Sequence, residues 1–96
     1  MEFTELQKRY KPQILALAEK YGTDNVRVFG STVRDDATPD SDIDLLIHVR
    51  KGTSLLDLSA LYIELGILTG CKIDLIPDDS VAPDIRDHIF REARPL

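Results

Sequence analysis

The segment Val28–Ile47, which reads VFGSTVRDDATPDSDIDLLI, most constrains what this chain can fold into. Its apolar residues indicate two strands, one that ends just before Gly30 and one that starts at Asp42. Between them lie a glycine–serine turn and a polar loop that contains Pro39 and several aspartates. This order fits a strand–turn–loop–strand unit, and we expect the rest of the chain to act as its scaffold.

The second of these strands carries two carboxylates. Side chains alternate between faces along a strand, so Asp42 and Asp44 point the same way while the residues between and after them point to the other face. Two carboxylates about 7 Å apart along a strand repel each other unless a cation lies between them. Because Mg²⁺ takes one or two carboxylates and completes its shell with water and phosphate oxygens, the pair predicts a magnesium site.

The glycine–serine turn before the loop predicts a phosphate site. Gly30 permits a sharp turn and the close approach of a ligand, and Ser31 is expected to cap a short helical turn that ends near Arg34. Free N–H groups at the start of that turn and the Arg34 guanidinium would both suit a phosphate. We expect the polar loop to fold back and bring this phosphate site beside the two carboxylates.

A third carboxylate, Asp74, interrupts the apolar run Cys71–Ile76. We expect it to be buried there, where an unpaired charge costs free energy and therefore needs a partner. One interpretation is a salt bridge, for example to Lys72 or Arg86. The other, which the upstream aspartate pair favours, is that Asp74 joins the metal site.

The remaining pattern predicts helices on a small mixed sheet. Apolar residues at three- and four-residue spacing predict a helix before Gly22 and another over residues 55–69. We expect Pro12 to open the main part of the first helix and Pro83 to open the last one. The expected strands are Val26–Phe29, Asp42–Val49 and Cys71–Ile76.

The segment between the first two strands has no room for a crossover helix, so we expect those strands to be antiparallel. The fold class is therefore α/β (α+β), with a mixed three-stranded sheet and packed helices in one domain over residues 1–96.

Composition limits the partners and the compartment. The formal net charge of −5 argues against a general nucleic-acid binder, which normally presents a basic patch. A single cysteine, Cys71, excludes an intramolecular disulfide and a cysteine zinc cluster.

The polar N-terminal segment has no signal-peptide pattern, and no apolar run approaches the roughly 20 residues that span a bilayer. We expect a cytoplasmic protein with no membrane partner.

The spacing G-S-x10-D-x-D, followed by an aspartate on a later strand, resembles the DNA polymerase β-like nucleotidyltransferase superfamily. The segments RVFGSTVRDDATPDSDIDLLI and GCKIDLI resemble the corresponding segments of its minimal nucleotidyltransferases. These are the MntA-type antitoxins that are paired with HEPN-domain toxins. The resemblance covers the chain from about Tyr21 to Leu96. One position departs from the pattern, because Asp35, followed by Asp36, stands where many members have glycine.

The resemblance implies the polymerase β-like nucleotidyltransferase fold and an Mg²⁺-dependent enzyme that binds ATP. It implies that Gly30 and Ser31 hold the triphosphate and that three catalytic carboxylates, Asp42, Asp44 and Asp74, ligate two Mg²⁺ ions. Asp74 would also take the proton of the attacking group.

As an antitoxin of a type VII toxin–antitoxin pair, the chain would transfer AMP to a tyrosine hydroxyl of a HEPN ribonuclease toxin, within a hetero-oligomer. An alternative remains open: a non-catalytic antitoxin that acts by binding alone. The acidic residues Asp35 and Asp36 beside the phosphate site are the feature that keeps this alternative in view.

Overall fold

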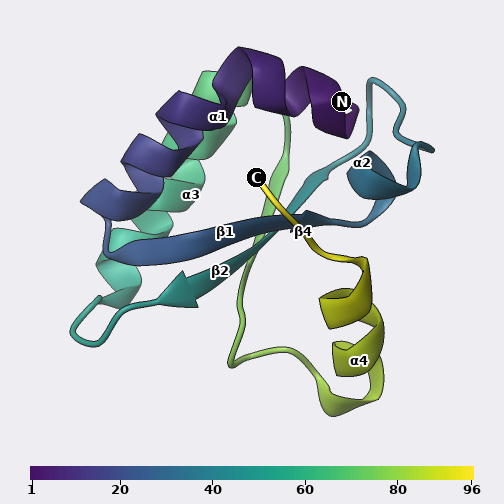
Figure 1. Ribbon diagram of the computed structural model, residues 1–96. Helices are drawn as coiled ribbons and strands as arrows, with labels where there is room; N and C mark the ends of the chain where they lie inside the picture. Colours follow the sequence, from purple (N-terminus) through teal and green to yellow (C-terminus); the bar gives the residue numbers. More distant parts are fainter.

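The computed structural model describes residues 1–96 as helices packed on a small mixed sheet (Figure 1), and the expected α/β class is confirmed. The helices are α1 (Phe3–Lys20), α2 (Ser31–Arg34), α3 (Leu55–Thr69) and α4 (Pro83–Glu92). The strands are β1 (Thr23–Phe29), β2 (Ile43–Val49), β3 (Ile73–Pro77) and β4 (Arg94–Pro95).

The sheet has four strands in the order β3-β2-β1-β4. β1 and β2 are antiparallel, as predicted, and β2 and β3 are parallel, with α3 as the crossover between them. The prediction of three strands was wrong because β4 also pairs with β1, through Arg94 opposite Val28. A strand of two residues is too short to show an alternating pattern, so only the fold reveals it.

The two faces of the sheet are covered differently. α1 and α3 lie together over one face, and α4 lies on the other side of the sheet (Figure 1). Leu45 and Ile47 of β2 are buried in the larger core on the side of α1 and α3. Leu46 belongs to a smaller cluster with Ile89 of α4. Because α4 is short, it leaves room for polar side chains on its face of the sheet.

The prediction that Pro12 opens the main part of the first helix was wrong, because α1 is continuous from Phe3. The first turns are held by Phe3 and Leu6, which are 4% and 0% exposed in the core. Pro12 lies on the exposed side of the helix. It removes one N–H from the hydrogen-bond ladder, and the carbonyl that loses its partner can bond to water instead.

Local hydrogen bonds and a glycine define the two ends of α3. Ser54 Oγ accepts a hydrogen bond from the Asp57 N–H, and Asp57 Oδ2 accepts one from the Ser54 N–H at 3.0 Å. Gly70 ends the helix in the left-handed conformation at φ 68°. This reciprocal pair of hydrogen bonds is a capping box, and it stabilises the first turn of α3.

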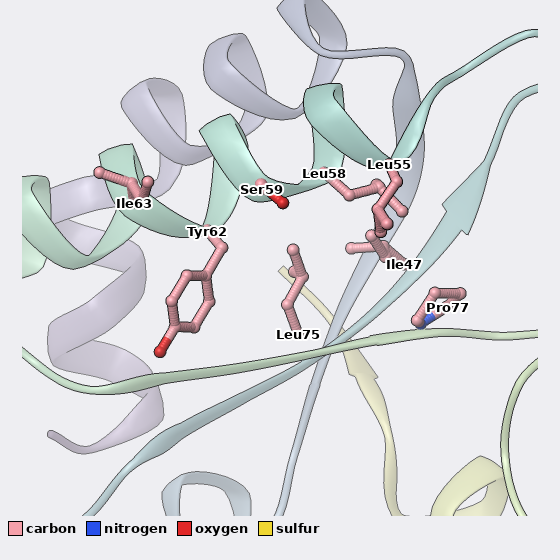
Figure 2. Close-up of a pocket in the computed structure, with 8 residues that line it drawn as sticks. All are labelled: Ile47, Leu55, Leu58, Ser59, Tyr62, Ile63, Leu75 and Pro77. Carbon is pink, nitrogen blue, oxygen red and sulfur yellow. The ribbon is translucent and has the colours of Figure 1, made fainter.

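The apolar stripe of α3 packs on the sheet only in part. Leu61 and Leu65 are buried, but Leu55 is 79% exposed. Beside them, Tyr62 of α3 and Leu75 of the edge strand β3 help to line an apolar hollow of about 500 Å³ (Figure 2). This hollow opens on the helix-covered side of the sheet.

No helix combines the length and the apolarity needed to cross a lipid bilayer.

Candidate active site

Asp42 and Asp44 lie on the face of the sheet that α1 and α3 leave free. Ile43 and Leu45 are 0% and 1% exposed in the core beneath those helices, so the alternating aspartates face the other way. Both aspartates are partly accessible to solvent. Asp44 lies in β2 and Asp42 immediately precedes the first residue of that strand, close enough for its charge to act on Asp44.

Asp74 stands at the same level as Asp44 on the neighbouring strand. The parallel pairing of β2 with β3 makes Asp44 and Asp74 register partners. The expectation that Asp74 is buried was wrong, because its face of the sheet is open at this level and the side chain is exposed. It forms no ion pair with Lys72 or Arg86, so the salt-bridge interpretation finds no support.

The glycine–serine turn begins directly beside Asp44. Phe29, the last residue of β1, is the antiparallel partner of Asp44, so the chain turns at the level of that carboxylate. Gly30 has φ 76° and ψ −155°, a conformation that L side chains rarely adopt. A β-carbon at Gly30 would also overlap Asp44 Oδ2. Backbone geometry therefore favours glycine at this position, and a β-carbon would force the Asp44 carboxylate to move.

The prediction that Ser31 caps the helical turn was wrong by one residue. Ser31 is the first residue of α2, and Gly30 is its N-cap. The Gly30 carbonyl accepts hydrogen bonds from the N–H groups of Val33 and Arg34 at 3.1 and 3.2 Å. The Ser31 side chain remains partly accessible beside the turn. The turn thus places Gly30 next to Asp44, with Ser31 as the following residue.

The environment of Asp44 opposes a negative charge. Burial, together with the negative charges of Asp74 and Asp42, raises the pKa of Asp44 to about 6. The Arg34 guanidinium acts in the opposite direction. A group of carboxylates that repel one another is the donor set that a hard divalent cation neutralises.

The aspartates do not by themselves form a closed cluster of three metal ligands. A Mg²⁺ ion needs only one or two carboxylates when water and phosphate oxygens complete its shell. The oxygen donors present, and the mutual repulsion that raises the pKa of Asp44, therefore fit such an ion. The residues that could hold it are Asp42, Asp44 and Asp74.

A fourth acidic residue, Glu92, reaches this region from the end of α4. Its Oε1 atom accepts a hydrogen bond from the Gly30 N–H and lies 2.9 Å from Arg34 Nη1. The sequence gives no signal for Glu92, because nothing in the pattern of the last helix indicates a contact with the glycine–serine turn. The contact depends on how α4 packs against the open face of the sheet.

Asp35 ends α2 in the left-handed conformation at φ 62°. Glycine adopts this conformation with less strain than aspartate does. The side chains of Asp35 and Asp36 are both exposed. Asp36 lies 3.5 Å from Arg34 Nε in a weak, solvent-exposed ion pair.

Comparison with known families and relatives gives a consistent result. Residues 11–96 match the family described as "Nucleotidyltransferase domain". The chain is 34% identical over 93 residues to "Putative protein adenylyltransferase MJ0435" of Methanocaldococcus jannaschii, an alignment that covers 97% of this chain and 96% of that protein. It is 37% identical over 76 residues to "Protein adenylyltransferase MntA" of Thermococcus cleftensis, covering 79% and 77% of the two chains.

Solved structures agree with these sequence matches. One described as a "putative minimal nucleotidyltransferase" superposes with a TM-score of 0.86 at 38% identity, over 100% of this chain and 97% of the other. A chain from a toxin–antitoxin crystal structure with AMP-PNP superposes with a TM-score of 0.76, over 90% of this chain and 71% of that one. At 16% identity, this second likeness concerns the fold alone.

Proposed function

This chain belongs to the nucleotidyltransferase domain family, and from that membership we propose that it transfers AMP from ATP to a hydroxyl group of a partner protein. One structural observation carries the proposal. The Gly30 turn lies against Asp44, and Asp44 stands in register with Asp74 on the next strand. Groups suited to a triphosphate and groups suited to a divalent cation therefore lie side by side.

In the proposed reaction, one set of residues binds the phosphates of ATP and another holds the metal ions. The Gly30 N–H, the Ser31 hydroxyl and the Arg34 guanidinium bind the phosphate oxygens of ATP and fix their orientation. Asp42, Asp44 and Asp74 would hold Mg²⁺, two ions in our proposal, which when bound would neutralise phosphate charge and lower the pKa of the attacking hydroxyl.

The hydroxyl oxygen of the acceptor forms a bond to the α-phosphorus while the bond from that phosphorus to the bridging oxygen of pyrophosphate breaks. Asp74 accepts the proton that the hydroxyl loses, a role that suits an exposed carboxylate within reach of a second protein. The products are the AMP-modified partner and pyrophosphate. Most of the rate gain comes from positioning and from charge complementarity at the phosphates.

For the acceptor, we propose a tyrosine hydroxyl of a HEPN-domain ribonuclease toxin, held in a hetero-oligomer with this chain. Two findings support a protein acceptor. A relative carries the name protein adenylyltransferase, and a chain of the same fold was solved as part of a toxin–antitoxin pair with AMP-PNP. The net charge of −5 also suits a protein partner better than a nucleic acid.

The test uses ATP that is labelled at either the α- or the γ-phosphate. The protein is incubated with Mg²⁺, labelled ATP and a HEPN-domain partner with which it forms a complex. AMP transfer places the α-label on the partner and leaves the γ-label in pyrophosphate. The proposal fails if the complex forms and neither label reaches the partner, and label from the γ-position would indicate phosphoryl transfer instead.

Charge-neutral variants distinguish AMP transfer from the alternative, an antitoxin that acts by binding alone. Asp42→Asn and Asp44→Asn remove two carboxylates while preserving the shape of both side chains. If AMP transfer neutralises the partner, the double variant binds the partner but no longer protects RNA from it. If protection is retained in full, binding alone is sufficient.

A further inference from the structure

The carboxylate of Glu92 already occupies the groups that we assign to phosphate. Its Oε1 atom accepts hydrogen bonds from both the Gly30 N–H and Arg34 Nη1, the latter at 2.9 Å. The side chain of Glu92 is only 12% exposed, whereas that of Arg34 is 48% exposed. Glu92 is therefore held in the site and is not a freely moving surface residue.

A carboxylate oxygen and a phosphate oxygen make the same kind of contact. Each accepts charge-assisted hydrogen bonds from a backbone N–H and from a guanidinium. The Gly30 N–H has a single hydrogen atom and cannot serve both acceptors at full strength. Moreover, the negative charges of a triphosphate and of Glu92 repel each other at close range.

We propose that Glu92 acts as an internal competitor of the nucleotide, so that its carboxylate has to leave Gly30 and Arg34 before the phosphates of ATP can bind there. The inference rests on the proposed function, because it takes ATP to be the ligand of this turn. In this proposal Glu92, near the C-terminus, limits the affinity of the turn for the nucleotide.

In this same conformation, the other oxygen of Glu92, Oε2, lies 3.1 Å from His88 Nε2, one turn earlier on α4. The His88 side chain is 68% exposed, so this side of the carboxylate borders on solvent. Glu92 is the last residue of α4 and Ala93 is already extended, so the side chain can turn without breaking the helix.

Competition of this kind lowers the apparent affinity for the nucleotide, because only the molecules in which Glu92 has left the turn can bind it. The apparent affinity is the intrinsic affinity multiplied by the fraction of such molecules. Removing the charge of Glu92 weakens its hold on Gly30 and Arg34 and increases that fraction. Glu92→Gln keeps the size of the side chain and is the variant of choice. Asp87→Asn is the matched control, because it removes one negative charge from an exposed position of the same helix.

The test is calorimetric titration of each protein with Mg-ATP and, separately, with inorganic triphosphate. We expect Glu92→Gln to bind both probes about threefold to tenfold more tightly than the unchanged protein, a difference of up to about 1.4 kcal/mol. Asp87→Asn should bind them as the unchanged protein does. Equal or weaker binding by Glu92→Gln would overturn the inference, and so would equal tightening by both variants.

A second measurement examines the contact without any nucleotide. The amide resonance of Gly30 should shift in Glu92→Gln and should not shift in Asp87→Asn. An unchanged Gly30 resonance in Glu92→Gln would contradict the contact itself.

The two proposals can fail separately. If Glu92→Gln tightens triphosphate binding but no AMP reaches a partner, the proposed function is wrong and the competition remains. If AMP is transferred and Glu92→Gln gains no affinity, the competition is wrong and the function remains.

Discussion

Gly30 lies directly against the carboxylate of Asp44, so the turn at the end of β1 and the acidic strand β2 meet at one point. A β-carbon at Gly30 would overlap Asp44 Oδ2, and the positive φ of 76° disfavours other residues independently. Because Phe29 pairs with Asp44, the antiparallel register fixes this approach. The Gly30 turn and the Asp44 carboxylate therefore lie in one place on the open face of the sheet.

Gly30→Ala should disrupt this site. We expect a loss of about 2–3 kcal/mol in the free energy of unfolding, from backbone strain and from the overlap with Asp44, together with loss of ATP binding. Gly52→Ala is the control, because Gly52 also has positive φ, at 91°, but open space around it. It should lose only about 1 kcal/mol. Urea denaturation measures both, and equal losses would contradict the packing of Gly30 on Asp44.

Asp44→Asn should stabilise the metal-free protein at neutral pH. The pKa of Asp44 rises from 3.8 to about 6 in the folded protein, mainly through burial, so the folded state binds more protons between these values. The contribution of Asp44 to stability therefore falls as the pH rises through that window.

At pH 7.5 we expect Asn to raise the free energy of unfolding by about 1 kcal/mol, less than the full shift implies because solvent screens the group. The gain should disappear below about pH 4. Denaturation across this pH range measures it, with Asp40→Asn on the exposed loop as the control for lost charge. A gain that does not depend on pH would count against this account of Asp44.

Magnesium should stabilise the unchanged protein through the same carboxylates. A ligand that binds only the folded state raises the melting temperature, by a few degrees when it is present well above its dissociation constant. The double variant Asp42→Asn, Asp44→Asn should not respond. Thermal melts with and without MgCl2, at matched ionic strength and after chelation, provide the measurement. An equal rise in both proteins would mean that the ion binds elsewhere.

Asp35→Gly should stabilise the chain, because glycine adopts the left-handed conformation of this position more easily than aspartate. We expect a gain of about 0.5–1 kcal/mol. Asp36→Gly removes the same charge next to it, where φ is not positive, and should be neutral or destabilising. Chemical denaturation compares the two variants. A loss of stability in Asp35→Gly would mean that the aspartate side chain contributes more than the backbone strain costs.

Much of the site could be predicted from the sequence because its signals are local. The alternation around Asp42 and Asp44 follows from strand geometry, and the glycine of the turn follows from its place at the end of an apolar run. The exposure of Asp74 could not be predicted, since an apolar run does not tell which face of the sheet a helix covers.

The features that the sequence did not predict depend on contacts distant along the chain. β4 exists because two residues near the C-terminus pair with β1. Glu92 reaches Gly30 because α4 packs through Ile89 on the smaller core. α1 continues through Pro12 because the burial of Phe3 and Leu6 stabilises the turns before the proline more than the lost hydrogen bond destabilises them.

The intact mass of the partner protein tests most directly whether Asp42 and Asp44 are needed for AMP transfer. A HEPN-domain partner is incubated with ATP, Mg²⁺ and either the unchanged protein, Asp40→Asn, or the double variant Asp42→Asn, Asp44→Asn. We predict that the first two add one or more AMP units to the partner and that the double variant adds none while still binding it. Equal addition by the double variant, or no addition by the unchanged protein in a formed complex, would contradict the proposal.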